Sequence, residues 1–141
     1  MRQIMTQQAI IKIESTLDGE KLYNEYSGGY VFKNNAHNIA YTDLSGNAVT
    51  KTAIEANEEK MLLHRVGAFN GDMLFDRLTD TVTRYDAFSL TQGFLVHTYE
   101  YNVETNNSDV VISLKYGLID GKNENEIVAT QKITVNLGEK S

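Results

Sequence analysis

The chain has 141 residues, and its 13 lysines and arginines against 19 aspartates and glutamates give a formal net charge of −6. That length suits one domain with its own core, and 41% hydrophobic with 23% charged residues is typical of a globular protein. The acidic balance, without a dense basic cluster, argues against nucleic acid or an anionic membrane surface as partner. With no cysteine, the chain has no disulfide, thiolate nucleophile or cysteine-based metal site.

The start of the chain lacks an apolar stretch of signal-peptide length, and apolar runs elsewhere fall far short of a membrane span. We therefore expect a cytoplasmic protein. We expect a single domain over residues 1–141, with residues 1–7 as a loosely ordered N-terminus.

The first half of the chain predicts strands joined by tight turns. Residues 9–17 alternate between apolar and polar side chains, the period of a half-buried strand. Two-residue turns at Asp18-Gly19 and Asn34-Asn35 would carry the inward face through the next two strands. The side chains placed inward in this way are Leu22, Tyr26, Tyr30, Phe32, His37, Ile39 and Tyr41. A bulge at Gly28-Gly29 would break this pattern.

Residues 53–66 allow two interpretations. The segment is rich in helix-forming residues and could hold a short helix. A turn at Asn57-Glu58 between two strands fits the patterns on either side better. Further turns are predicted at Ser45-Gly46-Asn47, Asn70-Gly71, Thr79-Asp80, Gln92-Gly93, Asn106-Asn107 and Asp120-Gly121.

The last third of the chain alternates most clearly. Its predicted inward side chains are Leu95, His97, Tyr99, Tyr101 and Val103, then Val110, Ile112, Leu114, Tyr116 and Leu118, then Ile127, Ala129, Ile133, Val135 and Leu137. The short spacings between turns leave no room for helical crossovers. Because a long meander exposes two edges unless it closes, we predict an all-β, antiparallel up-and-down barrel of about 8–10 strands.

Several stretches resemble the YwiB-like family of bacterial calycin-like β-barrel proteins. They are Ile11-Lys12-Ile13-Glu14-Ser15-Thr16, Arg65-Val66-Gly67, Met73-Leu74-Phe75 and Gly93-Phe94-Leu95-Val96-His97-Thr98. Their order and spacing match from about residue 9 to residue 137. The sequence departs from the family at residues 89–93, where a Thr-Pro-Tyr-Gly turn is usual. The resemblance implies a lipocalin-like barrel and supplies neither an activity nor catalytic residues.

The candidate binding residues lie on the predicted inner face. His97 falls between apolar neighbours, either as a core histidine bonded to a neighbour or as the polar anchor of a cavity. Buried phenols need hydrogen-bond partners, so a tyrosine-rich interior favours a partly wet lumen or tyrosines at its mouths. Arg65 is either a solvated strand cation or, if turned inward, a partner for a carboxylate or an anionic ligand. The candidate ligand-binding set is Tyr30, Arg65, His97, Tyr99, Tyr101 and Tyr116.

Two functions of different class follow. The first is a non-enzymatic barrel that encloses a small apolar or aromatic ligand in a lumen containing tyrosine and histidine. The second is a structural or interaction barrel with a packed interior, which presents a sheet face or edge to another chain or to itself. The outward patch for that role would comprise Val96, Val111, Ile119 and Val128. An enzyme would need His97 beside a carboxylate in an open cleft, and no motif supports catalysis, a metal or a cofactor.

Overall fold

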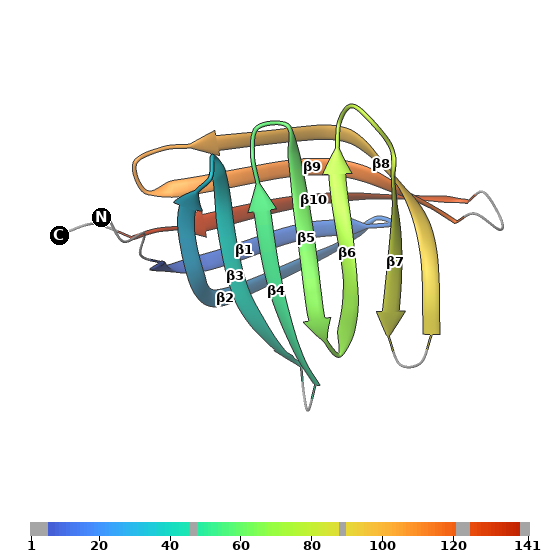
Figure 1. The fold of residues 1–141 in the computed structure, drawn as a ribbon, viewed down its shortest axis with the longest axis horizontal. Coiled ribbons are helices and arrows are strands. Elements are labelled where there is room, and N and C mark those ends of the chain that lie inside the picture. The colour runs from blue at the N-terminus through green and yellow to red at the C-terminus, as the bar shows by residue number, and fades with distance from the viewer. Residues whose placement is uncertain (1–5, 46–47, 88–89, 121–124, 139–141) are drawn as a thin grey trace.

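The computed structural model describes residues 6–45, 48–87, 90–120 and 125–138. Within these ranges the secondary structure consists of antiparallel strands, which follow one another along the chain as a meander (Figure 1). They are β1 (Gln7–Leu17), β2 (Glu20–Lys33), β3 (Ala36–Ser45), β4 (Ala48–Ala56), β5 (Lys60–Gly67), β6 (Phe69–Asp76), β7 (Thr81–Ala87), β8 (Leu90–Thr105), β9 (Asp109–Asp120) and β10 (Glu126–Asn136).

The sheet closes into a barrel. Each strand pairs with the next in sequence, and β1 also pairs with β10, so that Ile13 lies opposite Ile133. The predicted all-β meander and its closure are therefore confirmed. In Figure 1, β3 to β7 form the front layer, and β8, β9, β10 and β1 lie behind it and cross its strands at a large angle.

The first two turns confirm the predicted register. Asp18 and Gly19 have φ angles of 49° and 85°, and Asn34 and Asn35 have φ angles of 54° and 59°. Two consecutive positive φ angles define the turn that matches the twist of a hairpin. As a result Leu17 lies opposite Glu20 and Lys33 lies opposite Ala36.

Residues 53–66 form strand, turn and strand, so the turn interpretation is confirmed and the helix is not formed. The Asn57 side chain closes this turn, because its Oδ1 accepts hydrogen bonds from the backbone N–H groups of Glu59 and Lys60 at 2.9 and 3.0 Å. An asparagine that bonds to the backbone two or three residues ahead stabilises a turn.

Two predicted turns are wrong. Asn70-Gly71 lies inside β6, and the turn is at Gly67 instead. The Asn70 side chain stabilises that turn, because its Nδ2 donates to Gly67 O and its Oδ1 accepts from Gly67 N, both at 3.1 Å. Gln92-Gly93 lies inside β8. The turns predicted at Ser45-Gly46-Asn47 and Asp120-Gly121 include residues outside the described ranges.

A bulge in β8 reverses the predicted faces at the start of that strand. The pairing with β9 shifts between Thr98 and Glu100, so Tyr99 is an extra residue. Val96 and Thr98 are buried before the bulge, and Tyr101 is buried after it. The inward placement of Leu95, His97 and Tyr99, and the outward placement of Val96, are therefore wrong. One inserted residue moves every preceding side chain to the other face.

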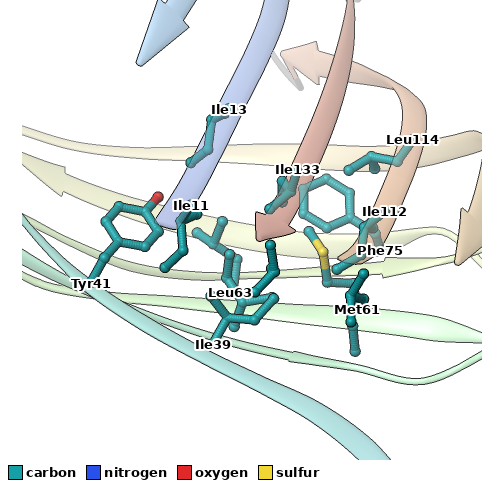
Figure 2. Close-up of a cluster of buried hydrophobic side chains, with 14 of the residues drawn as sticks. Ile11, Ile13, Ile39, Tyr41, Met61, Leu63, Phe75, Ile112, Leu114 and Ile133 are labelled. Carbon is teal, nitrogen blue, oxygen red and sulfur yellow. The ribbon is translucent and has the colours of Figure 1, made fainter. Parts of the chain in front are cut away.

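A packed apolar cluster fills much of the interior (Figure 2). Its fully buried side chains include Ile11, Ile39, Ile54, Met61, Phe75, Ile112 and Ile133, which come from strands on all sides of the barrel. Burial of each such side chain contributes about 1.5–3 kcal/mol of transfer free energy, which makes this cluster the main source of stability. Among the described residues no helix is long and apolar enough to cross a bilayer.

Candidate functional site

Arg65 faces the interior of the barrel. It lies opposite Thr52 on β4 and Gly71 on β6, and it shares its face with the buried Leu63. The tyrosine rings of β2 and β3 stack beside it: the centroids of Tyr26 and Tyr41 lie 4.4 Å apart at an angle of 17°. The undecided orientation of Arg65 is thus resolved in favour of the interior.

Asp43 and Arg65 act in opposite directions on the pKa of Tyr26 in this cluster. Burial raises the pKa of Tyr26 to about 12, the Asp43 carboxylate acts in the same direction, and the Arg65 guanidinium acts against it. Burial also raises the pKa of Tyr41, while Arg65 and a hydrogen bond with Thr52 lower it. Arg65 therefore already has the phenols as electrostatic partners inside the fold.

The other inward tyrosines of the candidate set also have partners within the fold. The Tyr30 hydroxyl lies 2.7 Å from Nδ1 of His37. The Tyr101 hydroxyl donates to the backbone carbonyl of Asn57 at 2.6 Å and approaches that of Lys60 at 3.1 Å. The Tyr116 ring packs edge-on against Phe75 with centroids 4.8 Å apart. The hydroxyls of Tyr30 and Tyr101 are thus hydrogen-bonded within the fold, as buried polar groups usually are.

His97 and Tyr99 lie together on the outer face. His97 Nδ1 is 2.6 Å from Oδ1 of Asp80, which extends from the loop between β6 and β7. The Tyr99 hydroxyl donates to Glu126 Oε1 at 2.5 Å, and the two aromatic rings meet edge to face at 4.5 Å. Lys115 Nζ lies 5.9 Å from the centre of the Tyr99 ring, within range of a cation–π contact.

A hollow of about 960 Å³ begins beside these residues and crosses five neighbouring strands. We call it the outer groove, because most of its lining side chains alternate with core residues and so face away from the interior. Those outward residues are Glu14, Thr16, Lys21, Tyr23, Tyr99, Glu100, Asn102, Ser113, Lys115, Thr130 and Lys132. The lining also includes the residues that lie between these outward residues along each strand, namely Ser15, Leu22, Tyr101, Leu114 and Gln131. Arg77 from the β6–β7 loop completes it.

The outer groove gathers positive charge in an acidic chain. Its lining contains Lys21, Arg77, Lys115 and Lys132, against the two carboxylates Glu14 and Glu100. The middle of the floor is made of short side chains, and the hydroxyls of Thr16 and Thr130 hydrogen-bond to each other there. Long charged and aromatic side chains around a short, polar floor create the depth of the hollow.

The chain matches the model of a domain of unknown function (DUF1934) over residues 5–135. The chain belongs to this family. Among solved structures it is similar to the ywiB protein from Bacillus subtilis, with a TM-score of 0.83 and 20% identity over 95% of this chain and 94% of that one. A search of the curated proteins finds no match. The resemblance to the YwiB-like family is confirmed, and at this identity the structural likeness shows the fold alone.

Sequence reasoning on this DUF1934 chain missed the cations of the outer groove. Arg77 lies in a loop, and Lys132 is one of the polar residues in an ordinary alternating strand, so neither residue belongs to a recognisable motif. Lys21 on β2 is brought toward Lys132 by the pairing of β1 with β10, which no hairpin turn fixes. Within the described ranges no three His, Asp or Glu side chains are grouped as metal ligands would be.

Proposed function

We propose that this protein is a non-enzymatic small-molecule-binding barrel, whose ligand is an aromatic molecule that carries a carboxylate or phosphate group. The proposed site is the outer groove. The lumen that the sequence favoured is less suitable, because His97 and Tyr99 face outward and the interior contains a packed apolar cluster. We propose a cytoplasmic location for this activity.

One observation carries the proposal: a chain of net charge −6 places four cations and only two carboxylates around one hollow. Lys132 lies opposite Glu14 and Lys115 lies opposite Glu100, so the excess positive charge of the lining comes from Lys21 and Arg77. These two cations repel their positive neighbours, and folding gains nothing from their placement. An anionic group bound among them would offset that repulsion and form charge-assisted hydrogen bonds.

The aromatic part of the ligand is suggested by the tyrosines at the two ends of the groove. Tyr23 is exposed at 55% and Tyr99 at 45%, and both belong to the lining. An exposed phenol ring offers a flat apolar face for stacking. The volume of about 960 Å³ is at the upper end of the range usual for small-molecule sites.

The test is a binding measurement with charged and uncharged pairs of probes. Isothermal titration would compare AMP with adenosine and indole-3-acetate with indole. We expect the anionic member of at least one pair to bind detectably and its neutral counterpart at least about tenfold more weakly, the size of one charge-assisted contact. The two pairs distinguish a phosphate ligand from a carboxylate ligand.

Matched variants locate the site. Lys132→Gln should weaken binding of the anionic probe about fivefold or more, because it removes a groove cation. Lys12→Gln removes the same charge one row away, outside the groove, and should leave affinity unchanged. If no probe binds, or if both variants reduce affinity equally, the outer groove is not the site.

An interaction barrel is the second candidate, favoured by the apolar residues left on the outer face. Val128 is exposed at 40%, while Val111 and Ile119 are half-buried. Val96, assigned to the same patch from the sequence, is buried in the core. The remaining residues would suit a protein partner if the groove binds no small molecule.

A further inference from the structure

One half of β2 has an unpaired edge. Residues 28–33 pair with β3 on one side and β1 on the other, whereas within the described ranges residues 20–27 pair with β1 alone. Residues 20–25 are all exposed, and Leu22 and Tyr23 expose 54% and 55% of their surface. In Figure 1, β2 runs along the lower border of the layer that contains β1. Unpaired strand edges are templates for pairing with another chain.

The backbone groups on this edge follow from the turn that precedes it. In the turn at Asp18-Gly19, Leu17 and Glu20 close the hairpin as a hydrogen-bonded pair. Such pairs alternate along an antiparallel ladder, so the even-numbered residues of β2 bond to β1. The N–H and C=O groups of Lys21, Tyr23 and Glu25 therefore point away from β1 and toward the open edge.

The edge is complementary to itself. If two copies meet antiparallel with Tyr23 opposite Tyr23 of the partner subunit, then Lys21 lies opposite Glu25 of the partner subunit, and Glu25 opposite Lys21. The same register brings the outward-pointing N–H and C=O groups of these residues face to face. An arrangement in which each residue pairs with its symmetry mate is that of a two-fold dimer.

We propose that the chain forms a homodimer by antiparallel pairing of the β2 edge, residues 20–27, about a two-fold axis at Tyr23. Two Lys21–Glu25 ion pairs fix its register, since opposite charges directly across a ladder attract. The Tyr23 rings meet on the outer face and Leu22 covers the inner one. The contact is small for a protein interface, so the dimer is reversible and concentration-dependent.

Charge exchange tests this register. Sedimentation velocity without added ligand, from about 10 μM to about 1 mM, would show the wild-type chain shifting from monomer to dimer. In the dimer, Glu25→Lys replaces each of the two Lys21–Glu25 pairs by two facing lysines. It should therefore weaken the dimer about tenfold or more. The double variant Lys21→Glu with Glu25→Lys restores the pairing and should regain the wild-type constant.

That rescue cannot come from within one chain, because Lys21 and Glu25 are four residues apart in an extended strand, about 13 Å. Tyr23→Pro supplies a second measurement: it removes an N–H that faces the open edge and leaves the pairing with β1 intact, so it should give a folded monomer. Circular dichroism would confirm folding of each variant. A wild-type monomer at the highest concentration, or a double variant as weak as Glu25→Lys, overturns the proposal.

This proposal does not rest on the proposed ligand. Lys21 and Tyr23 also line the outer groove, so the dimer constants are measured without ligand, and Glu25→Lys, outside the groove, changes the edge without changing the lining. A dimer with no ligand binding would support the edge alone, and ligand binding by a monomer would support the groove alone.

Discussion

At the scale of single residues, Tyr101 shows how a polar group can hold two parts of a barrel together. Its ring is buried, and its hydroxyl crosses from β8 to the turn between β4 and β5, where it donates to the Asn57 carbonyl. Burial raises the pKa of this phenol, so it remains a donor at neutral pH. The carbonyl it satisfies belongs to the turn between β4 and β5 and not to either strand.

Replacing Tyr101 by phenylalanine keeps the ring and removes this donor. We expect Tyr101→Phe to lower the free energy of unfolding by about 1–3 kcal/mol, because the Asn57 carbonyl would lose its hydrogen bond. Urea denaturation followed by circular dichroism measures the change. The control is Tyr23→Phe, whose hydroxyl donates to Glu25 at the surface and whose loss should leave the midpoint unchanged. Equal effects of the two variants would contradict this role for Tyr101.

At the scale of strands, the sequence predicted faces well wherever hairpin turns set the register. Leu22, Tyr26, Tyr30 and Tyr41 lie on the expected face, since the pairing runs unbroken through Gly28. In β8 the same reasoning failed because the bulge at Tyr99 has no glycine, proline or other local signal. A bulge is decided by the curvature that closure requires, which is a property of the whole sheet.

At Gly28 the neighbouring strands approach closely. A Cβ atom built there would lie 2.2 Å from the Ala40 carbonyl oxygen and 2.6 Å from Cδ1 of Ile11. We expect Gly28→Ala to destabilise the fold by about 2 kcal/mol or more, since β2 or β3 must shift to relieve an overlap with backbone. Gly93→Ala is the matched variant, because its Cβ would lie 3.7 Å from the Thr83 oxygen and should cost less than about 0.5 kcal/mol. Thermal unfolding of both variants compares them, and a neutral Gly28→Ala would show that the strands are less constrained than their geometry indicates.

At the scale of the molecule, closure was predictable and its consequences were not. Alternation and turn spacing indicate a long antiparallel meander, and its edges favour closure. The outer groove arises because closure aligns β1 with β10, so that Thr16 meets Thr130 from 114 residues away. No local signal sets that register. Arg65 could not be oriented for a related reason, since both faces of its segment are apolar in sequence.

Because of its inward tyrosines, the barrel should lose stability as the pH rises into the alkaline range. Burial raises the pKa of Tyr26 to about 12 and also raises those of Tyr30, Tyr41 and Tyr101 above the value of about 10 for an unfolded chain. Above pH ~10 the unfolded chain therefore loses these protons first, the folded state binds more protons, and stability falls as pH rises. Below pH ~10 both states are protonated at these residues, so their full contribution is present there.

Urea midpoints at pH ~8 and pH ~11 would measure this loss, with Tyr26→Phe as the variant that isolates one phenol. Lysines also titrate in this range, so the informative quantity is the difference between the two proteins. We expect the midpoint of the wild type to fall more steeply with pH than that of Tyr26→Phe, because the variant lacks one group whose proton is retained by folding. Parallel declines would mean that Tyr26 releases its proton equally well in the folded and unfolded chains, which its stack on Tyr41 and its contact with Asp43 oppose.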